Sequence, residues 1–228
     1  MLIISRMRKI IVIGMLLFTL GISAQSKQQL REELKEATAA LSLRPDSLDL
    51  RLKKAALNMQ LEQWEYALSE YNYVLRLDPE NPAGLYYRAY ANEQLGRYNF
   101  ARADYETLLK IVPSNFEARL GLALLNQKDR HFTEAMDQIN QLVEANPNNA
   151  TVYVARANME RERRMYALAE YDFTQAILLE PEVTDHLVNR ADVRLLMENY
   201  EGAKADLDLL VKKGVLKAAL QDFYKRLK

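Results

Sequence analysis

The side chains that could do chemistry in this sequence are few, and they do not form a catalytic pattern. The chain has two histidines, His131 and His186, and no cysteine. The histidines lack the paired spacing of a metal site, and no acid–histidine–nucleophile grouping accompanies them. A glycine-rich phosphate-binding loop is also missing. We therefore expect no enzymatic activity, no metal and no cofactor, and we expect both histidines to be surface or loop residues.

Charged residues, by contrast, recur as base and acid at a separation of 16 positions. Both charges are present in four cases and both are absent in one: Lys54/Glu70, Arg88/Asp104, Leu122/Gln138, Arg156/Asp172 and Arg190/Asp206. A charge left alone at a partly buried contact is costly, so partners are expected to be lost together. We interpret the pattern as an ion pair between two helices. A row of arginines that binds an anion is the alternative.

The elements that carry these pairs repeat with a period of 34 residues. Five of the six prolines follow this period, from Pro45 to Pro181. Two series of alanines follow it as well, and so does an aromatic residue. These three series are Ala55, Ala89, Ala123, Ala157 and Ala191; Ala67, Ala101, Ala135, Ala169 and Ala203; and Trp64, Tyr98, Phe132, Tyr166 and Tyr200. A fixed period of this length predicts a solenoid of repeated units.

Each period contains two amphipathic runs and no strand pattern, which predicts an all-α fold. The residue types within it resemble the tetratricopeptide repeat (TPR). Leu95-Gly96-Arg97-Tyr98, followed by Ala101 and Tyr105, is close to the usual form of that family. Val215 stands where the family would have a proline. The resemblance implies a right-handed superhelical solenoid of five TPR helix pairs with N- and C-terminal capping helices.

We predict four segments along the chain. They are a signal peptide at 1–24, an N-terminal capping helix at 25–46, five repeats within 47–214 and a C-terminal capping helix at 215–228. The registers of the repeats are 48–81, 82–115, 116–149, 150–183 and 184–217.

The first residues have the layout of a secretory signal. Three cations, Arg6, Arg8 and Lys9, precede the apolar run 10–22, and small residues follow at a plausible cleavage point before Gln25. We expect export, most simply to the periplasm, with no membrane span left after cleavage. The alternative is a membrane anchor through uncleaved residues 10–22, although this run is shorter than the roughly 20 residues that span a bilayer. Without cysteine, disulfides and attachment of lipid to an N-terminal cysteine are excluded.

The expected partner is another protein or a peptide. Equal numbers of basic and acidic residues, 31 of each, argue against nucleic-acid binding. The resemblance to the TPR family implies that the first helices line a concave groove. The groove positions of repeats two to four are occupied by Tyr86, Tyr90, Glu93, Gln94, Leu120, Leu124, Gln127, Lys128, Asn158 and Arg161. We predict a non-catalytic scaffold or adaptor of the cell envelope that binds a peptide or helix there. The alternative is a structural, homo-oligomeric envelope component that uses its convex face or capping helices.

Overall fold

The computed structural model describes residues 24–227, and every regular element in them is a helix. The prediction of an all-α fold is thereby confirmed for this part of the chain. The predicted signal peptide lies outside the described residues except for Ala24. The described residues divide into two compact units, with the boundary between Gly96 and Arg97.

The first unit is described from its long N-terminal helix onward. Its helices are α2 (Ala24–Leu43), α3 (Leu48–Gln60), α4 (Trp64–Leu77) and α5 (Pro82–Gln94). Each packs against the next in the chain. Tyr71 and Tyr87 are stacked in the core with their ring centroids 6.0 Å apart, beside the fully buried Ala55 and Ala67.

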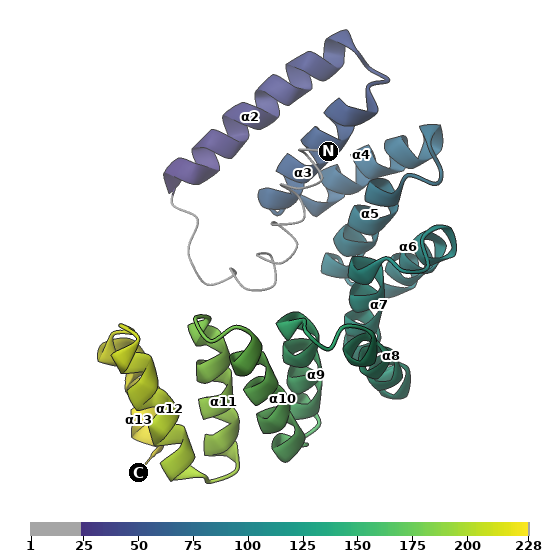
Figure 1. Ribbon diagram of the computed structural model, residues 1–228. Coiled ribbons are helices and arrows are strands. Elements are labelled where there is room, and N and C mark those ends of the chain that lie inside the picture. Colours follow the sequence, from purple (N-terminus) through teal and green to yellow (C-terminus); the bar gives the residue numbers. More distant parts are fainter. Residues whose placement is uncertain (1–23, 228) are drawn as a thin grey trace. The chain divides into compact units, whose positions relative to one another are not determined.

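The second unit continues the alternation of first and second helices. It contains α6 (Tyr98–Ile111), α7 (Phe116–Lys128), α8 (Phe132–Ala145), α9 (Ala150–Glu162), α10 (Tyr166–Leu179), α11 (Thr184–Leu196), α12 (Tyr200–Lys212), the 3-10 turn η1 (Lys217–Leu220) and α13 (Gln221–Arg226). Figure 1 shows α9 to α12 side by side, and consecutive helices pack from α6 to α12. At the C-terminal end, Gly214 has a φ of 93° after α12, as its type favours. Leu220 is buried beyond it, whereas Leu216 is exposed.

The period of the sequence reappears in how the helices begin and turn. Four first helices follow a residue whose side-chain oxygen accepts a hydrogen bond from a backbone N–H of the first turn: Ser47, Asn81, Asn115 and Asn149. The turn inside each pair holds one residue at positive φ, between 59° and 71°: Glu62, Gly96, Arg130, Arg164 and Glu198. Because four of these five residues carry a side chain that disfavours this conformation, the packing of the helices fixes the turn.

The alanines of both periodic series are completely buried. In three repeats, the two alanines of a helix pair belong to one packed cluster: Ala55 with Ala67, Ala123 with Ala135, and Ala157 with Ala169. Small side chains at these sites let two helices approach closely, to about 8–10 Å between axes. In these three repeats the alanines therefore mark where the helices of a pair touch.

The structure shows the predicted ion pair between paired helices in the first, fourth and fifth repeats. Lys54 lies 2.7 Å from Glu70, Arg156 donates to both carboxylate oxygens of Asp172 at 2.6 and 2.8 Å, and Arg190 donates to Asp206 at 3.1 and 2.6 Å. In the third repeat, which has Leu122 and Gln138 in these places, Gln138 instead accepts a hydrogen bond from Asn126 at 2.8 Å.

The arginines of this series also reach the preceding repeat, a contact that the sequence pattern did not predict. Each donates from Nη1 to a side-chain oxygen 16 residues earlier at 3.0 Å: Arg88 to Asn72, Arg156 to Asn140 and Arg190 to Thr174. For Arg156, one guanidinium on α9 thus joins the α10 of its own pair to the α8 of the pair before.

We expect the Arg156→Ala variant to lose about 3 kcal/mol or more of unfolding free energy in urea denaturation, because Asp172, which is 1% exposed, loses its cation. The double variant Arg156→Leu/Asp172→Gln copies the pair found in the third repeat and should recover most of this loss. Equal destabilisation of the single and double variants would show that the buried charge is not the cause.

Gly121 provides a second test of the packing. A Cβ atom at this position in α7 would lie 2.8 Å from Cζ of Tyr105, a buried residue of α6. Gly121→Ala should therefore destabilise the protein by about 1–3 kcal/mol, whereas the same change in an open helix stabilises by about 0.5–1 kcal/mol. A rise in the melting temperature of this variant would mean that α6 and α7 are not so closely packed.

Candidate protein-binding surfaces

The predicted groove residues of the first unit lie on α5 and are largely covered. Tyr86 is half-buried and meets the ring of Tyr87 edge to face, with centroids 5.1 Å apart. Tyr90 is also half-buried, 6.0 Å from the ring of Trp64. Burial, together with the charge of Glu93, raises the pKa of Tyr90. Glu93 is buried and Gln94 half-buried. The ring of Tyr90 thus lies against α4, and Tyr86 packs against Tyr87 of its own helix and the cluster around Tyr71.

The predicted residues of the second unit lie on α7 and α9 at different depths. Leu120 and Gln127 are buried, Lys128 is exposed, and Leu124, Asn158 and Arg161 are half-buried. Of the six predicted residues on these two helices, three are therefore partly accessible and one, the cation Lys128, is exposed. Whether a partner binds there stays a prediction.

Polar side chains link successive first helices in the second unit. Gln127 of α7 donates to Glu162 of α9 at 2.7 Å, and Arg161 lies 3.4 Å from Asp192 of α11. Asn158 shares the face of Arg161 and Glu162, because residues three and four positions apart stand above one another on a helix. Its amide makes no hydrogen bond within the described residues. These links were not predicted from the sequence, although their spacing is close to the repeat period.

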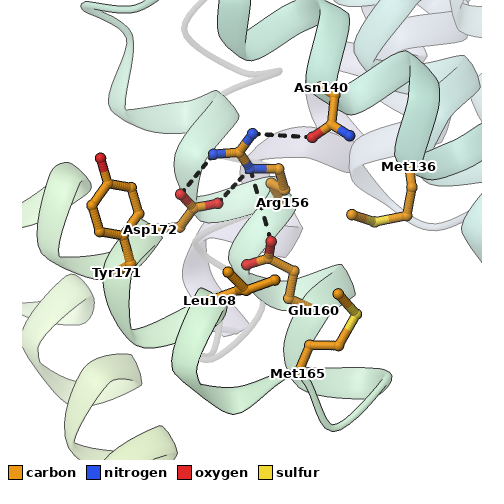
Figure 2. A pocket seen from close by; sticks show the side chains of 8 residues that line it. All are labelled: Met136, Asn140, Arg156, Glu160, Met165, Leu168, Tyr171 and Asp172. Atoms are coloured by element: carbon orange, nitrogen blue, oxygen red, sulfur yellow. Dashed lines mark hydrogen bonds and ion pairs between the residues drawn. The ribbon is translucent and has the colours of Figure 1, made fainter.

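The opposite side of α9 borders a pocket of about 340 Å³ (Figure 2). The pocket is lined by Met136 and Asn140 from α8, Arg156 and Glu160 from α9, Met165 from the following turn, and Leu168, Tyr171 and Asp172 from α10. Figure 2 shows the guanidinium of Arg156 held between Asp172 and Asn140, with the Glu160 carboxylate below it. No residue of this pocket was among the predicted binding residues.

Glu160 is the unusual member of this group. Its side chain is buried, and its Oε2 atom has no hydrogen-bond partner among residues 24–227, while Oε1 lies 4.0 Å from Arg156. Burial raises the pKa of Glu160 from an ordinary 4.5 to about 7, and the negative charge of Asp172 adds to the effect, against the opposing influence of Arg156. The carboxyl group is therefore partly protonated near neutral pH.

Large apolar side chains are exposed chiefly on the second helices. Tyr66, Phe100 and Leu168 occupy the same repeat position, with exposed fractions of 68%, 67% and 50%. On α10, Tyr171 and Leu178 are exposed in addition to Leu168. Exposed apolar groups of this size are candidates for contact with another protein.

The two histidines do not form a site. His131 is exposed, as expected, with Nε2 3.4 Å from Asp129. His186 was expected at the surface, and this was wrong: it is 3% exposed, because the first turn of α11 packs inward, and its Nε2 lies 3.2 Å from Glu180. Within the described residues, no three metal-ligating side chains come together.

Comparison with known families decides the nature of the repeats. Residues 52–116 and residues 94–159 each match a family model described as tetratricopeptide repeat. Residues 52–159 are tetratricopeptide repeats. This confirms the resemblance noted in the sequence, and TPR proteins are generally non-catalytic mediators of protein–protein interaction.

Solved structures match this chain over most of its length. A TPR protein from Parabacteroides merdae is 26% identical, with a TM-score of 0.73 over 89% of this chain and 79% of its own. MamA from Desulfovibrio magneticus is 18% identical, with a TM-score of 0.62 over 73% of this chain and 94% of its own. YrrB, described as a TPR protein with an unusual peptide-binding site, is 20% identical, with a TM-score of 0.54 over 78% of this chain and 91% of its own. The latter two show the fold alone, and comparison with curated proteins found no match.

None of the helices between residues 24 and 227 is both long enough and apolar enough to span a membrane.

Glu160 should make stability depend on pH. Because its pKa is higher in the folded state than in the unfolded chain, the folded state binds more protons between about pH 4.5 and 7, and its stability falls as pH rises through this window. Between about pH 5 and pH 8, the unfolding free energy of the wild type should fall by about 2–3 kcal/mol more than that of Glu160→Gln, measured by urea unfolding at both pH values. The prediction fails if wild type and variant change equally between the two pH values.

Proposed function

We propose that this protein is a non-catalytic scaffold or adaptor that binds a segment of a partner protein on the face of its first helices, and that it acts in the cell envelope after export. The binding proposal rests mainly on the position and the amide of Asn158. It occupies a predicted groove position, it is half-buried, and its amide makes no hydrogen bond within the described residues.

An asparagine amide of this kind suits recognition of a polypeptide backbone. The side chain offers both a donor and an acceptor, which are the two groups that a peptide unit presents. A partly buried amide without partners gains more from a new hydrogen bond than one already satisfied. Leu124 of α7 supplies an aliphatic contact, and the charges of Arg161 and Lys128 lie on the same pair of helices.

The links between first helices support this proposal in a second way. The Gln127–Glu162 hydrogen bond and the Arg161–Asp192 ion pair fix long side chains that would otherwise be mobile. A surface fixed before binding loses less side-chain entropy when a partner arrives. The TPR protein YrrB, by its description, has a peptide-binding site, which makes a peptide or an extended segment a reasonable ligand for this chain as well.

Export is supported by the N-terminal sequence. The cations Arg6, Arg8 and Lys9, the apolar run 10–22 and the small residues before Gln25 together have the composition of a secretory signal. N-terminal sequencing of the mature protein from cells should find Gln25 as its first residue. A mature chain that retains residues 10–22 would support an anchored form instead.

The exposed apolar residues of the second helices favour a second candidate function. Leu168, Tyr171 and Leu178 on α10 would suit a structural component that contacts another chain through its second helices, including another copy of itself. The two functions place the partner on different helices, so one experiment distinguishes them.

The experiment is site-specific photocrosslinking in intact cells, with benzoylphenylalanine placed either at Leu124 of α7 or at Leu178 of α10. We expect a discrete crosslinked partner from position 124 and none from position 178. Asn158→Ala should weaken capture of this partner about tenfold or more through the lost backbone hydrogen bonds. The matched control Asn148→Ala, an exposed asparagine in the turn before α9, should leave capture unchanged.

Crosslinking from position 178 alone would contradict the first-helix proposal and support the structural one. Equal capture by the Asn158→Ala and Asn148→Ala variants would remove Asn158 from recognition.

A further inference from the structure

The pocket beside Glu160 differs from the equivalent places in the neighbouring repeats. Glu160 is the eleventh residue of its repeat, and the second helix of the preceding repeat contributes Met136, 24 residues earlier, to the same pocket. The same two positions in the adjoining repeats are occupied by Arg102 with Asn126, and by Glu170 with Arg194. The second unit therefore holds three versions of one contact between repeats.

An arginine side chain fills two of these three contacts. Arg102 of α6 donates to Asn126 and, at 2.6 Å, to Asp129. Arg194 of α11 donates to Glu170 at 2.6 Å and to Asp206 at 2.9 Å. The guanidinium comes from the earlier repeat in the first contact and from the later repeat in the second. In both it bonds a polar group of the repeat on the other side.

The third contact lacks this guanidinium. Met136 cannot donate a hydrogen bond, and Oε2 of Glu160 is buried without a hydrogen-bond partner in the part of the chain that the structure describes. The charged groups that face Glu160 are Arg156 on its own helix and Asp172 on α10, while α8 contributes only Met136 and Asn140 to the pocket. Because Arg156 is already bonded to Asp172 and Asn140 and reaches Glu160 Oε1 only at 4.0 Å, it compensates the Glu160 carboxylate only in part.

We propose that this pocket binds the guanidinium group of an arginine side chain from a partner protein, with Glu160 Oε2 as its acceptor. The pocket volume of about 340 Å³ gives room for such a side chain. Met136, Met165 and Leu168 would cover its methylene stem, as apolar surfaces commonly do for arginine. Tyr171, which is 59% exposed, also lines the pocket and offers an aromatic face to the cation.

Charge supports a cation over other ligands. A buried carboxylate whose partner is distant is costly when ionised, and accordingly burial raises the pKa of Glu160 to about 7. A guanidinium would favour the ionised form and make a charge-assisted hydrogen bond. Glu160 and Asn158 are two residues apart, about 200° around α9, so this site is separate from the first-helix surface and does not depend on it.

The test follows the Glu160 carboxyl directly, by ¹³C NMR of the purified protein with labelled glutamate. We expect Nα-acetyl-arginine methylamide, added near pH 7, to shift the Glu160 ¹³Cδ signal saturably toward the ionised position. The neutral isostere Nα-acetyl-citrulline methylamide should not. Glu160→Asn, which restores the residue found at Asn126, should weaken binding of the arginine compound by about tenfold or more, measured by calorimetry.

Met136→Arg supplies the missing guanidinium within the chain, as Arg102 does naturally. In this variant Glu160 should be ionised near pH 7 without any added compound, and the arginine compound should no longer bind. Equal responses to the citrulline and arginine compounds, or no saturable response in wild type, would overturn the proposal. Tighter binding of Nα-acetyl-lysine methylamide would overturn the assignment to arginine.

Discussion

One guanidinium bonded to the helices on both sides of it is the interaction that fixes the pairing and stacking of the fourth and fifth repeats. Arg156 joins α9 to α10 through Asp172 and to α8 through Asn140, and Arg190 does the same for its own neighbours through Asp206 and Thr174. Apolar packing and buried alanines bring helices together but are tolerant of small shifts. A planar guanidinium with bonds in both directions allows far fewer arrangements, because its donors have fixed geometry. Each arginine thus sets both the pairing of two helices and the stacking of that pair on the one before.

Much of this architecture could be predicted from the sequence because equivalent positions of the five repeats can be compared with one another. The joint loss of charge at Leu122 and Gln138 revealed the ion pair, and the alanine series located the helix contacts. The bond to the preceding repeat was missed, although Asn72, Asn140 and Thr174 also lie on the period, since a neutral partner leaves no charge correlation to notice. The turns at Glu62, Arg130, Arg164 and Glu198 could not be foreseen from residue preference, which argues against their positive φ.

The binding surfaces were predicted less well, for a related reason. Groove positions taken from the family indicate which side of a helix a residue occupies, but its depth depends on what the next helix places over it. Tyr90 is half-buried with its ring near that of Trp64, and Gln127 is buried and bonded to Glu162. The pocket at Glu160 did have a signal in the sequence: its repeat position is Asn58, Asn92 and Asn126 in the first three repeats, then Glu160 and Arg194. That signal has a meaning only once the structure shows that Met136 and Glu160 line the same pocket.

Hydrogen exchange of the Arg156→Leu/Asp172→Gln protein, followed by mass spectrometry, tests the bridging role of the arginine most directly. This variant keeps apolar packing between α9 and α10 in the manner of the third repeat, so global unfolding should not dominate its exchange. If Arg156 holds the preceding pair as well as its own, amides of α8 should exchange faster than in wild type, while those of α12, beyond the reach of Arg156, should not. Wild-type protection throughout α8 would contradict the account and reduce the arginine to a bond within one helix pair.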